Sequence, residues 1–363
     1  MTSITAVRSA FPSHRYSQEE LTSAVAGLAP GLRDEPLNPA RRALLERLHR
    51  NAGVRTRHTV LPVGDYSGFA DGPGESNDRY ITEATGLGAR ALESALSSAG
   101  AAAGDVDLLV VTSVTGVAVP SLDARLIPRL GLRPDVKRLP VFGLGCVAGA
   151  AGLARVHDYL RGWPGHTAAL LSVELCSLTW RSDADSTADL VASGLFGDGA
   201  AAVIARGSPP GPPGASGPPG AAEILGTRSE VYPDSGDTLG WRLGSDGFRI
   251  VLTADLADVV SRHLAGTVTS FLSSHGLTVG DISAWICHPG GPKVLDAVQD
   301  CLKLPASALA VSRASLAAVG NLSSASVLHI LEQTLDAQVE PGSHALMIGL
   351  GPGVSAELVL LRC

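Results

Sequence analysis

Three residues with side chains suited to covalent acyl chemistry stand at the ends of predicted elements: Cys146, His288 and Asn321. Cys146 lies within VFGLGCVAGAAG, after a short apolar run typical of a strand and before an alanine- and leucine-rich run that predicts a helix over 148–160. Unpaired amides and the positive end of a helix dipole favour a thiolate over a thiol. The alternative is a small core residue, because free cysteine is among the most buried residue types.

His288 and Asn321 also follow or precede predicted elements. His288 comes directly after AWIC, a predicted strand, and before the turn and helix of PGGPKVLDAV. Asn321 follows Gly320 ahead of an amphipathic helix, where asparagine is a natural N-cap. Taken singly, a hydrogen-bonded core histidine and a helix cap explain the two residues. Taken together with Cys146, they form a Cys/His/Asn set that supports nucleophilic acyl transfer.

The composition indicates a compact globular protein of 363 residues, with 45% hydrophobic and 17% charged residues. A formal net charge of -7 argues against a general role in binding nucleic acid or membrane surfaces. No apolar run approaches the ~18 residues that span a bilayer, and Arg8 interrupts any secretory signal. Five scattered cysteines without a CxxC pair predict reduced thiols in a cytoplasm and no zinc site.

The chain repeats itself on either side of a segment rich in proline and glycine. LSSAGAAAGDVDLLVVTS begins at Leu96, and LSSHGLTVGDISAWICHP begins at Leu272, 176 residues later. Each copy predicts a helix ending at glycine, a short loop with aspartate and an apolar strand. The two halves also end with similar segments, each passing from a glycine turn into an apolar strand: GLFGDGAAAVIARG (194–207) and IGLGPGVSAELVLLRC (348–363). We therefore expect two similar α/β halves, 1–206 and 221–363, joined by an exposed connection at 207–220, with a site where they meet.

Six segments, in order, resemble one known family. They are GLGCVAGAAGLARVHDYL around Cys146, SVELCSLT (172–179), GLFGDGAAAVI (194–204), CHPGGPKVLDAV (287–298), GNLSSASV (320–327) and GLGPGVSAELVLLR (349–362). The sequence is similar over nearly its whole length to the type III polyketide synthases, the chalcone and stilbene synthase-like enzymes, and in detail to the bacterial ones. The resemblance implies an α/β thiolase fold of five layers (αβαβα), a homodimer and a buried site between the halves.

The resemblance also implies roles for single residues. The nucleophile falls on Cys146, which takes a starter acyl group from coenzyme A. His288 and Asn321 then stabilise the enolate formed when malonyl-CoA loses carbon dioxide, and a site without acids suits that step. A gatekeeping phenylalanine falls on Phe196, although a phenylalanine before a glycine turn is also a typical core residue. No tightly bound cofactor is implied.

Further residues are expected to shape the substrate path. Thr115, Val119 and Cys176 are candidates for lining an acyl tunnel, Gly240 and Ile250 for shaping the cyclisation cavity, and GLGPG (349–353) for a turn beside it. Core packing explains the tunnel candidates equally well. Within 40–58, an expected amphipathic helix and turn, Arg47 and Arg50 resemble the basic entrance that contacts coenzyme A phosphates; a solvated helix face is the alternative.

The local sequence resembles members that take long aliphatic starters, and an alkylpyrone or alkylresorcinol is the expected product. Related bacterial enzymes that start from malonyl-CoA tend to have a cysteine near Val114. Delivery of the starter by an acyl carrier protein rather than by free coenzyme A stays open.

Three other functions stay open as well. A ketoacyl synthase III of the same superfamily is disfavoured because HPGGP replaces its asparagine-containing motif. A papain-like hydrolase shares the order Cys, His, Asn, but its signature around the cysteine is absent. A non-catalytic acyl-binding protein would need a broken Cys/His/Asn set, and all three residues are present.

Overall fold

The computed structural model describes residues 1–363 except 32–37, 67–72, 181–185, 210–220, 245–246 and 254. A nine-stranded sheet runs through the molecule in the order β11-β12-β13-β8-β1-β7-β6-β4-β5. Its strands are β1 (Thr2–Ala10), β4 (Val106–Thr112), β5 (Lys137–Val141), β6 (Thr167–Leu175), β7 (Asp198–Gly207), β8 (Ala222–Val231), β11 (Ile282–Cys287), β12 (His344–Gly351) and β13 (Ser355–Arg362).

The expected duplication is visible in the strand pairing. In the first half β4 runs parallel to β6, which pairs antiparallel with β7; in the second, β11 runs parallel to β12, which pairs antiparallel with β13. The repeated loops match too, because Asp105 accepts a hydrogen bond from the N–H of Ala102 and Asp281 from that of Thr278. β7 ends at Gly207 and β8 begins at Ala222, so most of the expected connection lies outside the described residues.

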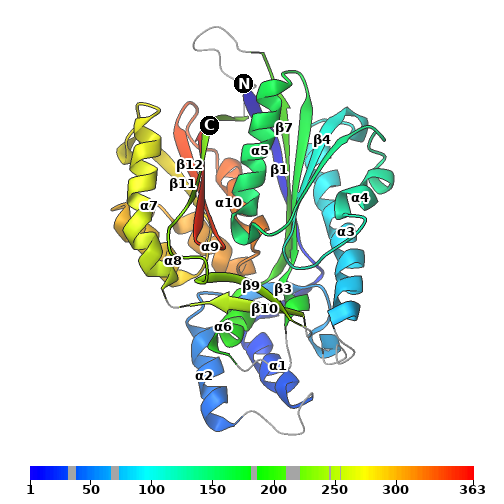
Figure 1. Ribbon diagram of the computed structural model, residues 1–363, viewed down its shortest axis with the longest axis vertical. Helices are drawn as coiled ribbons and strands as arrows, with labels where there is room; N and C mark the ends of the chain where they lie inside the picture. Colours follow the sequence, from blue (N-terminus) through cyan, green and yellow to red (C-terminus); the bar gives the residue numbers. More distant parts are fainter. Residues whose placement is uncertain (32–37, 67–72, 181–185, 210–220, 245–246, 254) are drawn as a thin grey trace.

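Helices cover both faces of each half and fill the space between them (Figure 1). The outer helices are α3 (Pro73–Ser98) and α4 (Leu122–Leu130) on the first half, and α7 (Leu256–Ser273) and α8 (Pro292–Cys301) on the second. Between the halves lie α5 (Ala148–Gly162) and α10 (Ser324–Asp336), which contact each other. The layers therefore follow the expected αβαβα order of the thiolase fold.

The strands are apolar on both faces because each face packs against a different helical layer. Along β4, Leu108 and Val110 pack toward the central helices, whereas Leu109 and Val111 join the core under α3. Along β12, Met347 belongs to the central core, and its neighbours belong to the core under α7 and α8. Such two-sided burial produces continuous rather than alternating apolar runs.

Smaller elements gather at one end of the molecule, at the bottom of Figure 1. They are the β2 (His14–Ser17) and β3 (Thr56–Thr59) pair, the hairpin of β9 (Leu239–Gly244) and β10 (Gly247–Leu252), and the helices α1 (Gln18–Gly31), α2 (Pro39–Arg50) and α6 (Thr187–Leu195). The remaining helix, α9 (Ala310–Val319), contacts β3. No helix of the described residues is long and apolar enough to cross a membrane.

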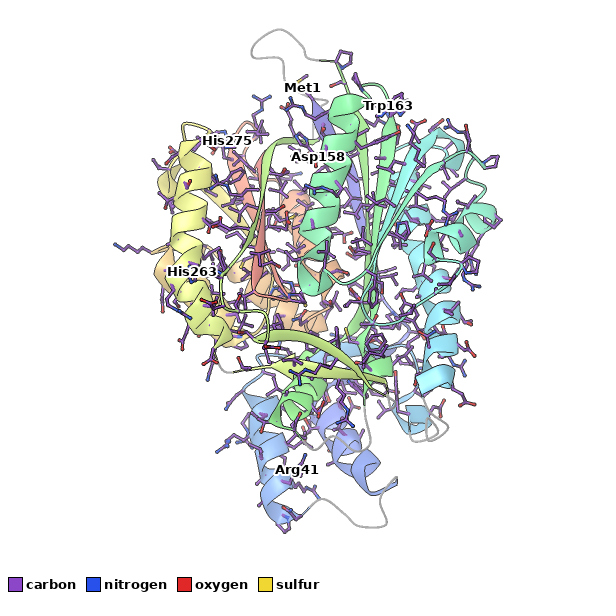
Figure 2. The ribbon with its side chains drawn as sticks, in the orientation of Figure 1. Met1, Arg41, Asp158, Trp163, His263 and His275 are labelled. Atoms are coloured by element: carbon purple, nitrogen blue, oxygen red, sulfur yellow. The ribbon has the colours of Figure 1, made fainter. Side chains whose placement is uncertain are left out.

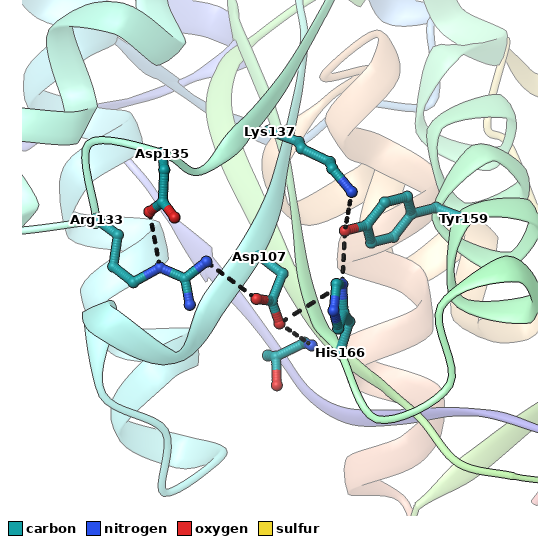
Figure 3. Close-up of polar contacts among 7 residues, drawn as sticks. Asp107, Arg133, Asp135, Lys137, Tyr159 and His166 are labelled. Carbon is teal, nitrogen blue, oxygen red and sulfur yellow. Dashed lines mark hydrogen bonds and ion pairs between the residues drawn. The ribbon is translucent and has the colours of Figure 1, made fainter.

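A cluster of polar and aromatic side chains ties the edge strand β5 to the helix and strand beside it (Figure 3). The Lys137 ammonium lies 3.8 Å from the ring centre of Trp163 and 5.0 Å from that of Tyr159. The Tyr159 hydroxyl bonds His166 Nδ1 at 2.7 Å. Trp163 and Arg41 of α2 lie toward opposite ends of the molecule (Figure 2), so this cluster is far from the smaller elements.

Candidate active site

Cys146 lies on a 3-10 turn, η3 (Gly145–Val147), that runs directly into the central helix α5. The glycines around it allow close approach of the second half of the chain. Gly145 has φ +58°, and a Cβ there would stand 2.5 Å from Pro352 in the turn between β12 and β13. A Cβ on Gly149 would stand 2.2 Å from the Ser324 carbonyl oxygen at the start of α10. The glycine-rich frame thus brings Cys146 against the other half.

The surroundings of Cys146 favour the thiol. Burial raises its pKa to about 12; the hydrogen bond with Ser323, Sγ to Oγ 3.5 Å, lowers the pKa, and the charge of Glu174 raises it. The expectation of a thiolate stabilised by the helix N-terminus is therefore wrong for the protein without substrate, because desolvation outweighs the favourable contacts. Thiolate formation needs a base.

Asn321 lies in the loop between α9 and α10, but it is not the N-cap of α10. Ser323 takes that position with φ +50°, a conformation uncommon outside glycine. The Asn321 Oδ1 accepts hydrogen bonds from the Ser323 N–H at 2.8 Å and the Ser326 hydroxyl at 3.3 Å. These bonds orient the side-chain amide, and its NH₂ group remains a donor for another acceptor.

Phe196 ends helix α6 and forms an isolated parallel bridge with Asn321. The N–H of Asn321 donates to the Leu195 carbonyl at 2.9 Å, and the N–H of Gly197 donates to the Asn321 carbonyl at 3.0 Å. The segment with the predicted gatekeeper, from the first half, is therefore fixed by backbone bonds to the segment with the asparagine, from the second half.

His288 follows the last residue of β11, as expected, and is 2% exposed. Its backbone N–H donates to the Ile348 carbonyl of β12 at 2.8 Å, and β12 contacts the turn η3 that carries Cys146. Its Nδ1 has no hydrogen-bond partner among the described residues. Burial lowers the pKa of His288 to about 3, so the imidazole is neutral at neutral pH.

One pocket unites most of the residues expected to line the substrate path. Cys146, Phe196, Thr115, Cys176, Gly240 and Ile250 all line it, together with Val114, Gly145, Leu239, Trp241, Ser323 and Pro352. Gly240 and Ile250 come from the β9–β10 hairpin, and Pro352 comes from the expected turn of GLGPG. His288 and Asn321 are not among the residues that line it.

Val119 does not line the pocket of its own chain. It is 90% exposed, in the loop between β4 and α4, so the expectation that it forms a tunnel wall is wrong within one chain. Arg47 and Arg50 are exposed on α2, which packs against the helix that ends at Phe196. They lie outside the pocket lining, and their role stays a prediction.

A buried carboxyl group contradicts the expectation of a site without acids. Glu174, at 0% exposure on β6, accepts bonds from the Val114 N–H at 3.0 Å and the Thr115 hydroxyl at 2.9 Å, and both residues line the pocket. The Ser324 hydroxyl also donates to it. Burial raises the pKa of Glu174, and these bonds lower it. A lone acid in the apolar run LLSVELC was the signal in the sequence.

Family models match the two halves separately. The N-terminal domain of chalcone and stilbene synthases matches residues 1–210, and the C-terminal domain matches residues 223–363. The chain belongs to the chalcone and stilbene synthase family. As a type III polyketide synthase, the protein is an acyltransferase that uses coenzyme A thioesters as substrates.

Relatives and solved structures agree with this membership. The chain is 56% identical to a 1,3,6,8-tetrahydroxynaphthalene synthase of Streptomyces peucetius subsp. caesius, over 99% of this chain and 93% of the relative. The crystal structure of the synthase of that name from Streptomyces coelicolor has a TM-score of 0.89 at 31% identity, with 99% of each chain covered. That of PKS-I from the brown alga Ectocarpus siliculosus has a TM-score of 0.91 at 27% identity, covering 99% of this chain and 98% of that one.

Proposed function

We propose that the protein elongates an acyl group on Cys146 with malonyl-CoA and cyclises the chain to an aromatic polyhydroxy product. The observation that carries this proposal is the junction at the pocket: the Cys146 thiol meets Ser323, whose N–H is bonded to Asn321. A nucleophile from one half and an amide donor from the other are thereby held beside one cavity, the arrangement that a condensation between two acyl groups requires.

Loading begins with transfer of the thiol proton of Cys146 to the neutral imidazole of His288. The sulfur attacks the thioester carbonyl of the starter, and the carbon–sulfur bond to coenzyme A breaks as that thiolate leaves with a proton. The high pKa of buried Cys146 and the low pKa of buried His288 support a neutral pair at rest, so that charge forms only during the reaction.

Extension needs a carbanion equivalent from malonyl-CoA. When malonyl-CoA loses carbon dioxide, the electron pair of the broken carbon–carbon bond stays on the remaining fragment. That fragment is a thioester enolate, whose oxygen carries the negative charge. An N–H of His288 and the NH₂ of Asn321 stabilise that oxygen, and Phe196 beside them excludes water from the reacting carbon. The enolate carbon then attacks the acyl thioester on Cys146, forming a carbon–carbon bond and releasing the sulfur.

One observation favours a short starter over a long one. The relative at 56% identity is a tetrahydroxynaphthalene synthase, and all carbons of a naphthalene ring can come from two-carbon units. We therefore place a tetrahydroxynaphthalene first, with malonyl-CoA as starter and extender. An alkylpyrone or alkylresorcinol is the second candidate, because Val114 stands where related malonyl-starting enzymes tend to have a cysteine.

Substrate delivery is assigned to the basic face of α2. Exposed Arg47 and Arg50 would bind the coenzyme A phosphates by charge-assisted hydrogen bonds, close to the helix that carries Phe196. An acyl carrier protein, with a phosphopantetheine arm, would have to dock at the same entrance. Competition by free coenzyme A, but not by dephospho-coenzyme A, would support direct use of coenzyme A thioesters.

A homodimer is the proposed assembly, and the cytoplasm the proposed compartment. Exposed apolar residues cluster near the edge strand β5: Val117, Val119, Leu139, Phe142 and Leu144. A surface of this kind is typical of an interface. A dimer in light scattering that becomes monomeric in Phe142→Asp would support it. Five free thiols suit a reducing compartment.

The product assay tests the function. Purified protein is incubated with radiolabelled malonyl-CoA, alone and with acyl-CoAs from acetyl to palmitoyl. We expect a cyclic product from malonyl-CoA alone that Cys146→Ala abolishes and Cys301→Ala, a half-buried cysteine outside the pocket, retains. Products that require a long acyl-CoA would instead establish the alkylpyrone or alkylresorcinol alternative. Release of coenzyme A without carbon–carbon bond formation would contradict a synthase.

A further inference from the structure

Arg57, on strand β3, is an unusual charge in the core of the protein. Its side chain is completely buried, and Nη1 donates to the Phe196 carbonyl at 2.6 Å. Nε and Nη2 have no hydrogen-bond partner among the described residues, and the guanidinium carbon lies 5.9 Å from the centre of the Trp180 ring. A buried cation with unsatisfied donors costs several kcal/mol of stability. Packing alone does not explain an arginine here.

The guanidinium remains charged at neutral pH. Burial lowers the pKa of Arg57 to about 10, and the nearby charge of Asp198 raises it. Asp198 is itself occupied by other donors, from Ser177 and the Val60 N–H. Besides its contact with the Trp180 ring, the guanidinium of Arg57 therefore donates to the carbonyl of Phe196, the residue predicted to be the gatekeeper.

The stem of Arg57 fits against two glycines, one on each segment of the site. A Cβ on Gly320 would lie 2.9 Å from Arg57 Cδ and 2.9 Å from the Leu195 carbonyl oxygen. A Cβ on Gly197 would lie 3.6 Å from the Arg57 Cβ and Cγ, and only 2.5 Å from the Val319 carbonyl oxygen. Arg57 thus lies against both segments where Phe196 and Asn321 form their backbone bridge.

The neighbouring residues of β3 hold the end of the helix that leads into Asn321. The Arg55 N–H donates to the Ala317 carbonyl at 2.8 Å, and the Thr56 hydroxyl donates to the Ala318 carbonyl at 2.6 Å. Arg55 and Thr56 therefore hold the last turn of α9, and Arg57 binds the gatekeeper segment. A shift of Arg57 would change the relative position of the two segments.

We propose that Arg57 is a positioning residue for malonyl decarboxylation, holding the Phe196 segment in register with Asn321. The inference rests on the proposed function, in which Asn321 and Phe196 surround the malonyl thioester. Displacing a donor by about 1 Å can reduce a rate by orders of magnitude. Loading of Cys146 does not depend on the relative position of the Phe196 segment and Asn321. Loading and decarboxylation should therefore respond differently to substitution of Arg57.

The test compares Arg57→Lys and Arg57→Met with the wild-type protein in two assays. The first measures carbon dioxide release from malonyl-CoA, and the second measures alkylation of Cys146 by iodoacetamide. We expect carbon dioxide release to fall about tenfold or more in both variants, with alkylation within about twofold of wild type. Arg155→Met is the matched control: Arg155 is exposed on α5 and pairs with Asp158. It should release carbon dioxide at the wild-type rate.

A double-mutant cycle separates positioning from a general structural role. If Arg57 acts through Asn321, adding Arg57→Met to Asn321→Ala should lower the rate of carbon dioxide release by less than about threefold further. A further tenfold loss of carbon dioxide release in the double variant, relative to Asn321→Ala alone, would overturn the proposal. So would wild-type decarboxylation in both Arg57 variants, an equal loss of alkylation, or failure of both variants to fold. A wild-type protein that releases no carbon dioxide would refute the proposed function instead.

Discussion

The thiol of Cys146 lies 3.5 Å from the hydroxyl of Ser323, and these two residues come from different halves of the duplicated fold. Ser323 also connects the proposed nucleophile to the catalytic asparagine candidate, since its N–H is bonded to Asn321. One serine in a strained backbone conformation therefore contacts the thiol and fixes the direction of the amide. The thiol and the amide are thus positioned by contacts across the junction of the two halves.

Removal of the Ser323 hydroxyl should make Cys146 less reactive. The hydrogen bond with this residue lowers a thiol pKa that burial has raised, so Ser323→Ala should raise the pKa further and reduce the thiolate fraction at any pH below it. Alkylation of Cys146, followed by peptide mass spectrometry, should be slower at pH 8. Ser274→Ala, at the exposed end of α7, is the control. Unchanged alkylation in Ser323→Ala would show that the contact does not affect the thiol.

The close approach of α5 to α10 predicts opposite effects for two glycine substitutions. A methyl group on Gly149 would meet the Ser324 carbonyl oxygen, whereas nothing lies within 4 Å of a Cβ on Gly86 in α3. Gly149→Ala should lower the free energy of unfolding by about 2 kcal/mol or more. Gly86→Ala should raise it by about 0.5 kcal/mol through helix propensity. Urea denaturation measures both, and equal stability of the two variants would contradict the tight packing.

His49 should make the protein sensitive to acid. Burial and the charge of Arg57 lower its pKa from 6.5 to about 4, and its ring bonds Thr22 and Ser193. Between these pH values the unfolded chain binds a proton that the folded chain does not, so stability is present above pH 6.5 and decreases as pH falls toward 4. The loss between pH 7 and 4.5 should be about 2 kcal/mol smaller in His49→Gln. If the free energy of unfolding falls equally with pH in the wild type and in His49→Gln, His49 is not the source of the acid sensitivity.

The aromatic contacts of Lys137 should stabilise the edge of the sheet. Its ammonium lies over the rings of Trp163 and Tyr159, an arrangement that contributes about 0.5 to 1 kcal/mol at exposed sites. Lys137→Met should lower the free energy of unfolding by about that amount. Lys303→Met, at an exposed lysine, should not. Thermal denaturation distinguishes the two, and an unchanged transition in Lys137→Met would exclude a stabilising cation–π contact.

The architecture could be predicted from the sequence because the signals were local and occurred twice. Glycine-terminated helices, aspartate loops and apolar strands recur with one offset, and Gly100 and Gly276 both have the positive φ typical of such helix ends. The place of Cys146 before a helix depended on the same kind of local pattern. Family motifs then assigned the pocket residues Phe196, Gly240 and Ile250.

The rest depended on contacts that a linear pattern does not contain. The sequence places Glu174 in an apolar strand, but it does not show the hydroxyl and amide donors from other segments that surround its carboxyl group. Desolvation, which reversed the expected charge state of Cys146, follows from enclosure by the whole fold. Val119 was expected in a tunnel because it matches a family position, but within one chain that position is on the surface. Arg57 stood in a run of arginines that resembled a solvated surface.

The most direct test of the central claim is mass spectrometry of the protein after brief exposure to malonyl-CoA or an acyl-CoA and rapid acid quenching. An acyl-transfer enzyme should carry a thioester on the peptide that contains Cys146, and the adduct should disappear in Cys146→Ala. Cys176, which lines the same pocket, should remain unmodified. An adduct on Cys176, or product formation without any modification of Cys146, would contradict the assignment of the nucleophile.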